Sequence, residues 1–253
     1  MSATQHTGNY ETAIITGGAS GIGFAIARKF VENNIRCILI GRDNAKLNEA
    51  CGCLGELAEC IRFDVTRLDE IPRLVEEIVE KYYRIDVLVN NAGIHLKKPI
   101  HEVTDEEFQK VILTNQSAVF SLSREVSKIM IKAGKGSIIN ISSMASRYGI
   151  PLVIAYSAAK SAVEGMTRAM AVELSPMGVR VNCIAPGFIE TEMSSKALNN
   201  DPERARKVFG RTPLGRLGSV DEIAGAALFL ATEASSFITG VVLPVDGGNS
   251  IGF

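Results

Sequence analysis

The eight residues 16–23, TGGASGIG, directly follow an apolar run, Ala13–Thr16, and lead into a segment of helical periodicity, Ile22–Asn33. Glycine lets the backbone turn sharply and lets a phosphate approach amide groups that a Cβ would shield. The positive end of the following helix then faces the anion. A strand, a glycine loop and a helix in this order indicate a dinucleotide-binding unit. The residues expected to hold the pyrophosphate are Gly17, Ser20, Gly21, Ile22 and Gly23.

The alternation of short apolar runs and longer helical segments continues along the chain. Short runs rich in Ile, Val and Leu fit strands buried on both faces, as in a parallel sheet. The expected strands are Ala13–Thr16, Cys37–Ile40, Cys60–Phe63, Val87–Val89, Ser137–Ile141, Arg180–Ile184 and Val241–Val245. The expected helices are Ile22–Asn33, Ala45–Leu57, Asp69–Tyr83, Asp105–Ala133, Ala155–Ser175 and Val220–Ala231. This order predicts an α/β fold, a Rossmann-type doubly wound parallel sheet of about seven strands with helices on both faces.

No Pro/Ser-rich linker and no internal repeat divides the sequence, which predicts a single domain over residues 1–253. The exception to the alternation is Gly187–Thr212, where polar residues and a weak helical pattern separate the sixth strand from the next helix. Long excursions in compact domains often cover a site. We therefore expect a substrate lid at residues 188–212, with a plain surface insertion as the alternative.

The charge balance is nearly even, with 27 Lys and Arg against 28 Asp and Glu and a formal net charge of −1. Nucleic-acid-binding domains are normally basic, so no nucleic-acid partner is expected. No apolar run approaches the ~20 residues that span a bilayer. The first twelve residues lack the basic start and apolar core of a signal peptide. We expect a cytoplasmic protein that does not bind membranes.

Five cysteines, an odd number, indicate reduced thiols in a cytosolic protein. Cys51 and Cys53 lie two residues apart on an expected helix, so they do not face the same way. The spacing of Cys and His residues does not match that of zinc ligands, and no metal site is expected.

The spacing of Gly17, Gly21 and Gly23 differs from the common G-x-G-x-x-G form and resembles the T-G-x-x-x-G-I-G motif of the short-chain dehydrogenase/reductase family. Further landmarks of that family follow in order: Asn90-Asn91-Ala92-Gly93, Asn115, Ser143, Tyr156-Ser157-Ala158-Ala159-Lys160, Pro186-Gly187 and Asp246-Gly247-Gly248. These motifs span nearly the whole chain, which makes the resemblance far more specific than any one of them. It implies an NAD(P)-dependent oxidoreductase that transfers a hydride between nicotinamide and a secondary alcohol or ketone.

Tyr156 and Lys160 lie one turn apart on an expected helix and therefore project from the same face. Tyrosine titrates near pH ~10 in water, and a neighbouring ammonium is expected to lower the pKa of Tyr156 toward the range of an acid/base catalyst. Ser143 follows the fifth expected strand, where open α/β sheets bind ligands. The resemblance implies that Tyr156 transfers the proton, Ser143 orients the substrate oxygen and Lys160 binds the nicotinamide ribose. It also implies that Asn115 holds a water that links Lys160 to solvent.

The end of the second expected strand bears on the choice of cofactor. An acidic residue there would hold the ribose hydroxyls and repel a 2′-phosphate. This sequence has Arg42 at that point and its first acid one step later, at Asp43. Arg42 can pair with a phosphate through two hydrogen bonds, so NADP(H) is favoured over NAD(H). In the alternative, Arg42 is solvated and Asp43 reaches back to the ribose.

The resemblance implies further cofactor contacts at the carboxyl ends of the expected strands. Asp64 and Val65 would contact the adenine, and Ile189 and Thr191 would hold the carboxamide of the nicotinamide. The remaining residues of the expected cofactor-binding set are Asn91, Ala92 and Gly93 at the ribose, together with Tyr156, Lys160, Pro186 and Gly187.

Substrate groups are expected from the loops around Ser143 and after Gly93 and from the insertion beyond Gly187. These segments contain His95, Lys97, Lys98, Met144, Arg147, Glu190, Glu192 and Met193. The candidates selected are His95, Ser143, Met144, Arg147 and Tyr156. A cluster of cations near the mouth of a site would suit an anionic substrate such as a sugar acid. A solvated rim of charges is the alternative.

Within the family, the stretches 115–120 (NQSAVF) and 211–213 (RTP) most resemble gluconate 5-dehydrogenases. The alternative is a 3-oxoacyl-[acyl-carrier-protein] reductase. Those enzymes usually present basic docking residues where this chain has Gly134 and Met177, although Lys132 and Lys135 are nearby. A non-catalytic dinucleotide-binding sensor is a further alternative. The family resemblance also implies a homotetramer that pairs the helices expected at 105–133 and 155–175.

Overall fold

The structure, a computed structural model, describes residues 11–191 and 202–252. Within these ranges seven parallel strands form one sheet in the order β3-β2-β1-β4-β5-β6-β7. The strands are β1 (Thr12–Thr16), β2 (Arg36–Gly41), β3 (Ala58–Arg62), β4 (Val87–Asn90), β5 (Gly136–Ile141), β6 (Val179–Pro186) and β7 (Val242–Val245). The helices are α1 (Gly21–Val31), α2 (Asn44–Leu54), α3 (Ile71–Tyr82), α4 (Asp105–Ile112), α5 (Ala118–Ala133), α6 (Ile154–Leu174), α8 (Pro202–Arg211) and α9 (Val220–Ala231).

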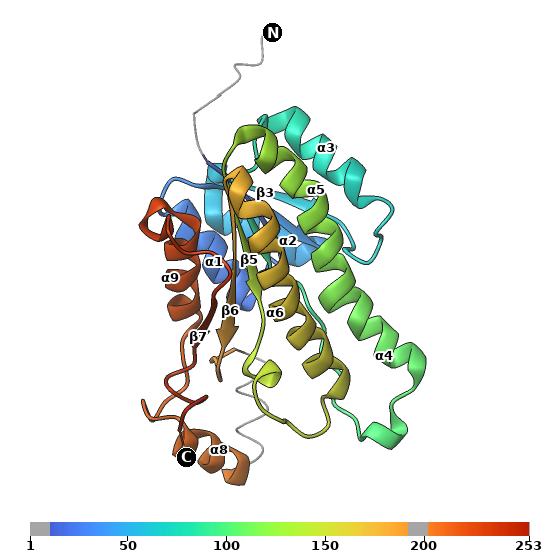
Figure 1. Cartoon of the computed structure of the whole chain (residues 1–253), viewed down its shortest axis with the longest axis vertical. Coiled ribbons are helices and arrows are strands. Elements are labelled where there is room, and N and C mark those ends of the chain that lie inside the picture. The colour runs from blue at the N-terminus through green and yellow to red at the C-terminus, as the bar shows by residue number, and fades with distance from the viewer. Residues whose placement is uncertain (1–10, 192–201, 253) are drawn as a thin grey trace.

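The sheet lies between two layers of helices (Figure 1). One core cluster joins β-strand side chains to α1, α2 and α9, with Phe30 and Leu230 fully buried. The other joins the opposite side chains of the sheet to α3, α5 and α6, with Leu88 fully buried. Because both faces are covered, the inner strands are largely apolar, and β1 is buried at all five positions. The predicted doubly wound fold is confirmed.

Local sequence signals set several of the helix boundaries. The α9 helix begins at a capping box, in which the Ser219 side chain accepts from the backbone nitrogen of Glu222 and the Glu222 side chain accepts from that of Ser219. The α2 helix ends three residues earlier than expected, because Gly55 adopts φ +75° and turns the chain out of the helix.

The helix expected at Asp105–Ala133 is not continuous, and that prediction was wrong in this respect. A π-helical segment, Leu113–Ser117, lies between α4 and α5 and contains the candidate residue Asn115. Hydrophobic periodicity could not reveal it, since an extra residue in one turn shifts the apolar face only locally. Such segments are frequent at functional sites.

The expectation of five reduced thiols was also wrong. Cys51 on α2 and Cys60 on β3 form a disulfide with 6.2 Å between their Cα atoms. Helix α2 packs along β3, which brings together two cysteines that are nine residues apart in the sequence. Cys37 and Cys183 are free and buried, and Cys53 is free and exposed.

The carboxyl ends of all the parallel strands meet at one edge of the sheet. The chain order reverses between β1 and β4, and open α/β sheets bind ligands at such a reversal. In Figure 1, α8 lies beyond this edge, away from both helix layers. Helix α8 and residues 188–191 belong to the predicted lid at 188–212, whereas its middle, residues 192–201, lies outside the described residues. In the described part of the chain, no helix is both long and apolar enough to span a bilayer.

Candidate active site

The glycine loop after β1 is held in place by the end of β4. Asn91 Nδ2 donates to the backbone oxygens of Thr16 at 3.0 Å and Gly17 at 3.2 Å. Thr16 Oγ1 accepts from the backbone nitrogens of Asn91 and Ala92, both at 3.0 Å. A Cβ on Gly23 would lie 2.3 Å from the Gly17 oxygen, and Gly17 itself has φ +65°. These glycines are therefore required for the close packing of loop and helix.

The first turn of α1 is suited to an anion. Ser20 is the N-cap residue, yet its side chain makes no capping hydrogen bond and is exposed. No acidic residue lies in the first turn, and a Cβ on Gly21 would meet nothing within 4 Å. The backbone amides of this turn and the Ser20 hydroxyl therefore fit a pyrophosphate group.

The ends of β2 and β3 bring two arginines together. Arg62 pairs in register with Gly41, and its Nε donates to the backbone oxygen of Arg42 at 3.3 Å. Asp43 caps α2, where its carboxylate accepts from the backbone nitrogens of Ala45 and Lys46 at 3.0 and 3.2 Å. The carboxylate of Asp43 is thus used within the helix, and sequence reasoning did not anticipate Arg62 beside Arg42.

Asp64 lies beside this arginine pair at the end of β3. Burial alone would raise the pKa of its carboxyl, but hydrogen bonds from Thr66 and the charges of Arg42 and Arg67 lower the pKa below its usual value. The neighbouring Val65 is 8% exposed. A low pKa keeps the Asp64 carboxylate able to accept a hydrogen bond from an adenine amino group.

Other expected cofactor residues also lie at this edge. Gly93 packs against Asn115, and a Cβ on Gly187 would lie 2.6 Å from the Asp246 Cα, because β6 and β7 end side by side. Pro186 is the last residue of β6. Ile189 is 6% exposed and forms an isolated bridge with Gly218, whereas Thr191 is only partly buried.

Ser143, just after β5, and Tyr156, in the first turn of α6, line the same cavity. Ser143 is extended and caps a short turn, Met144–Ser146, in which its Oγ accepts from the backbone nitrogen of Ala145 at 3.2 Å. Lys160 lies one turn further along α6, and its Nζ is 5.7 Å from the centre of the Tyr156 ring. Ser142 points away from Tyr156 and toward Glu164, as strand alternation predicts.

Burial dominates the ionisation of the Tyr156–Lys160 pair. It raises the pKa of Tyr156, and a hydrogen bond from Ser143 only partly offsets this. It also lowers the pKa of Lys160 from its usual 10.5 to about 8. The lowering of the Tyr156 pKa expected from the neighbouring ammonium is outweighed by burial here, and the Lys160 Nζ donates to the Ile141 oxygen at 2.6 Å. The role of Tyr156 in proton transfer stays a prediction.

Asn115 is fully buried in the π-helical segment. Its Oδ1 accepts from the Ile94 nitrogen and its Nδ2 donates to the Ile94 oxygen, both at 2.8 Å. The side chain therefore holds the loop that follows Asn91-Ala92-Gly93. Its expected role in holding a water for Lys160 remains a prediction.

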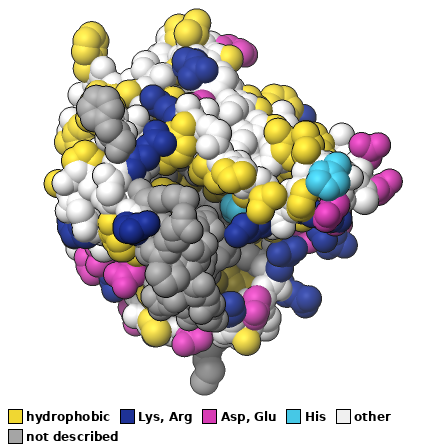
Figure 2. Space-filling view, turned by 90° about the horizontal axis from the view of Figure 1, so that it is seen from below, with side chains coloured by type: hydrophobic (Ala, Val, Ile, Leu, Met, Phe, Trp, Pro, Cys, Tyr) yellow, Lys and Arg dark blue, Asp and Glu magenta, His cyan; other side chains and the backbone are white. Residues whose placement is uncertain are grey.

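A cavity of about 600 Å³ opens beside Ser143 and Tyr156. The ring of His95 lies 4.4 Å from that of Tyr156, centre to centre. Lys97, which lies on one of the loops expected to supply substrate groups, also lines the cavity. Tyr148, Arg211 and Asn249 line it too, and sequence reasoning did not select them as substrate residues. The residues on loops lie where no strand or helix period indicates which way a side chain points. Arg211 is the last residue of α8, a segment whose helical pattern is weak in the sequence. Lys and Arg side chains lie on several sides of this end of the molecule (Figure 2).

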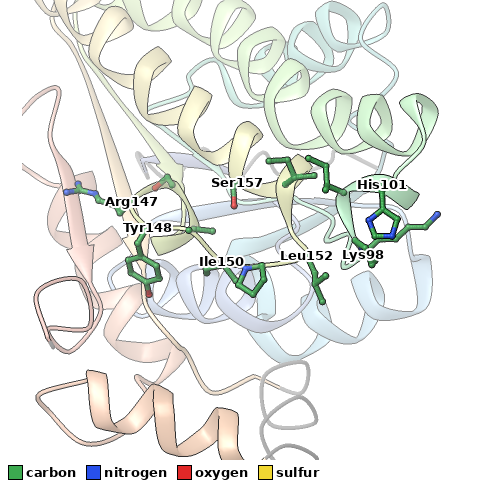
Figure 3. Close-up of a pocket in the computed structure, with 14 residues that line it drawn as sticks. Lys98, His101, Arg147, Tyr148, Ile150, Leu152 and Ser157 are labelled. Atoms are coloured by element: carbon green, nitrogen blue, oxygen red, sulfur yellow. The ribbon is translucent and has the colours of Figure 1, made fainter.

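Two of the expected substrate residues do not line this cavity. Met144 is 2% exposed and packs in the core. Arg147 lies at one end of a second cavity of about 650 Å³, with Lys98 and His101 at the other end (Figure 3). The two cavities share the loop residues 148–152 as a wall.

The comparisons with known proteins agree with this geometry. A family model described as enoyl-(acyl carrier protein) reductase matches residues 17–250. The chain is 42% identical over 243 residues to a 3-oxoacyl-[acyl-carrier-protein] reductase of Thermotoga maritima, covering 94% of this chain and 97% of the relative. It is also 42% identical over 238 residues to a 5-keto-D-gluconate 5-reductase of Escherichia coli K12, covering 93% of each. This chain is a short-chain dehydrogenase/reductase.

Solved structures support the same assignment of this short-chain dehydrogenase/reductase. A protein of Agrobacterium tumefaciens described as a gluconate dehydrogenase has a TM-score of 0.92 at 36% identity, covering 96% of this chain and 97% of that one. A Beutenbergia cavernae protein described as an NAD(P)-dependent gluconate 5-dehydrogenase, with NADP bound at low occupancy, has a TM-score of 0.88 at 39% identity, covering 94% and 96%. The enzyme is thus an oxidoreductase of hydroxyl and keto groups that uses a nicotinamide cofactor.

We expect Lys160→Met to change how stability depends on pH. The pKa of Lys160 is lower in the folded than in the unfolded chain, so the unfolded chain binds more protons between pH 8 and 10.5. The free energy of unfolding of the parent therefore gains up to about 3 kcal/mol from this group across that window, and the variant lacks this gain. Urea titrations at several pH values should show the variant-minus-parent difference falling as pH rises. A constant difference would contradict the burial of a charged Lys160.

Proposed function

We propose that this enzyme uses NADP(H) to interconvert a small anionic polyhydroxy ketone and its secondary alcohol, with gluconate and 5-ketogluconate as the best-matching pair. The observation that carries the proposal is the cavity beside Ser143 and Tyr156. His95, Lys97 and Arg211 line it, and its described lining includes no carboxylate. A site with cations and no acid favours a substrate that carries a negative charge.

Arg211 is held in an orientation that suits a carboxylate. Its guanidinium lies 4.2 Å from the centre of the Tyr148 ring, and its Nε donates to the Asn249 backbone oxygen at 3.0 Å. The Tyr148 hydroxyl bonds to Asn249 Oδ1, which fixes the ring on which the guanidinium rests. The Nη atoms have no partner among the described residues. Planar guanidinium groups bind carboxylates through two parallel hydrogen bonds.

In the proposed mechanism Ser143 and Tyr156 share the substrate oxygen. Both residues line the same cavity, so one substrate oxygen can contact both hydroxyls. Tyr156 would give its proton to the oxygen in reduction and remove it in oxidation, and Ser143 would hold the oxygen in place. Lys160 would bind the nicotinamide ribose from beneath Tyr156. The nicotinamide supplies or accepts the hydride when bound.

The preference for NADP(H) is part of the proposal. Arg42 and Arg62 meet at the ends of β2 and β3, where the adenosine ribose of the cofactor would lie. Asp43 is occupied by its two bonds to the amides of α2, which removes support from the alternative in which it holds the ribose hydroxyls. Two neighbouring guanidinium groups favour a 2′-phosphate.

A 3-oxoacyl thioester is the second candidate substrate. Ile150, Leu152, Phe188 and Val208 form an apolar part of the cavity wall that would suit an acyl chain. Against it, the positions where the related reductases present basic docking residues hold Gly134, the αL cap of α5, and Met177.

The homotetramer expected from the family remains a prediction. Phe120 on α5 is 48% exposed and Val172 on α6 is 80% exposed. These apolar side chains lie on the two helices through which copies of the chain would pair.

The substrate proposal is tested with a panel of carbonyl compounds, by following the absorbance of the reduced nicotinamide at about 340 nm. We expect NADPH oxidation with 5-ketogluconate and little with an uncharged keto-sugar or an acetoacetyl thioester. Tyr156→Phe, which keeps the ring and loses the proton, should reduce kcat by at least about 100-fold. Turnover of the thioester alone would overturn the sugar-acid proposal, and an unchanged Tyr156→Phe rate would overturn the catalytic one.

The cofactor preference is tested with Arg42→Ala and Arg62→Ala. Each removes one charged hydrogen-bond donor from the expected phosphate site, so KM for NADPH should rise about 10- to 100-fold while KM for NADH changes little. Arg67→Ala, at an arginine that also lies near Asp64, is the matched control and should leave both constants unchanged. Equal effects on the two cofactors would refute the 2′-phosphate site.

Arg211 is tested with Arg211→Ala, and Arg206→Ala on the same helix serves as its matched control. Loss of a charge-assisted pair should raise KM for 5-ketogluconate about 10- to 100-fold. KM for an uncharged keto-sugar should not change, because that substrate makes no such pair. If both substrates lose affinity equally, Arg211 acts through the shape of the cavity and not through its charge.

A further inference from the structure

A buried carboxylate, Glu164 on α6, lies behind Ser143 and has no part in the proposed mechanism. Its side chain is only 10% exposed, and it lies one turn beyond Lys160 and two turns beyond Tyr156 on the same helix. Its Oε1 accepts from Ser142 Oγ at 2.9 Å and also from Ser146 Oγ. A buried carboxylate is costly unless it is hydrogen-bonded, so these two serines stabilise it there.

The two serines flank Ser143 on the turn that follows β5. Ser146 Oγ also reaches the backbone oxygen of Ser143 at 2.5 Å. Ser142 Oγ lies 3.4 Å from the backbone oxygen of Lys160 and 3.3 Å from Ser146 Oγ. One carboxylate on α6 therefore connects the turn that carries Ser143 to the helix that carries Tyr156 and Lys160.

The bonding pattern also restricts how this turn can move. A carboxylate only accepts hydrogen bonds, so the Ser142 hydroxyl donates to Glu164 Oε1. The Ser146 hydroxyl lies within donating distance of both that oxygen and the Ser143 backbone oxygen, and it has one proton to share between them. Arg147 completes the arrangement: its Nε lies 4.0 Å from Glu164 Oε2, and its Nη2 donates to the Val242 backbone oxygen at 3.2 Å. The turn is thereby tied to both α6 and β7.

We propose that Glu164 is a positioning residue that fixes Ser143 Oγ relative to the Tyr156 hydroxyl. The inference rests on the proposed function, in which these two hydroxyls share the substrate oxygen. Ser143 belongs to a short turn between β5 and α6, so its hydroxyl moves whenever residues 142–147 move. A displacement of about 1 Å at a reacting group can reduce a rate about 100-fold.

The test compares Glu164→Gln and Glu164→Ala with matched variants at Glu125. Glu125 on α5 is also a buried carboxylate, 9% exposed, but it bonds to Arg124 and Lys128 and not to the Ser143 turn. We expect kcat with the active carbonyl substrate to fall about tenfold in Glu164→Gln and about 100-fold in Glu164→Ala. KM for the substrate and the Kd of NADPH, measured by fluorescence titration without turnover, should stay within about twofold, because no group that binds them is removed.

A kinetic isotope effect separates positioning from a structural role. With NADPH deuterated at C4, the isotope effect on kcat should rise in the Glu164 variants, because loss of alignment slows the chemical step. Glu125→Gln and Glu125→Ala should lower the melting temperature and leave kcat and the isotope effect unchanged. If the Glu164 variants lose only thermal stability, as the Glu125 variants do, the inference is wrong.

Serine variants keep the test decisive if Glu164→Ala does not fold. Ser146→Ala should reproduce the loss of kcat seen in Glu164→Gln, and the double variant should lose no more than either single one, since both break the same connection. Normal kcat in both Ser142→Ala and Ser146→Ala would overturn the inference. A failure of the proposed function itself is distinguishable, because Tyr156→Phe would then retain activity whatever the Glu164 variants do.

Discussion

Lys160 is almost fully withdrawn from water, and its Nζ donates to the Ile141 oxygen at the end of β5. Burial of an ammonium is unfavourable, and the lowered pKa of about 8 reflects that cost. The hydrogen bond fixes the first turns of α6 against β5, which brings Tyr156 to Ser143. The candidate active site therefore depends on a charge that the fold holds in an unfavourable place, as is frequent at functional sites.

Several polar side chains at the carboxyl edge of the sheet are hydrogen-bonded to the backbone. Asn91 binds the glycine loop, Asn115 binds both backbone groups of Ile94, and Thr16 accepts from the two amides that follow β4. Because loops cannot satisfy all their own backbone groups, these side chains make the loops rigid. The glycine loop and the first turn of α1, which are the candidate pyrophosphate site, are thereby held against the end of β4.

The net charge of the chain is near zero, yet positively charged side chains gather at two places. Arg42 and Arg62 meet at the ends of β2 and β3, and Lys97 and Arg211 line the cavity beside Tyr156. Fields from such clusters act over only about 10 Å in physiological salt, so each cluster can select its own anionic group. The overall composition of the chain gave no indication of either cluster.

The sequence by itself determined the α/β alternation, the seven strands and the glycine loop, because these follow from local periodicity and from residues that permit unusual backbone. It also indicated Ser143, Tyr156 and Lys160 as a group through motif spacing. Only the tertiary structure decided the pairing of Cys51 with Cys60, the meeting of Arg42 with Arg62, and the placement of Arg211 and not Arg147 in the cavity of Tyr156. These contacts join loops and elements distant in the chain, and no local period specifies where such side chains point.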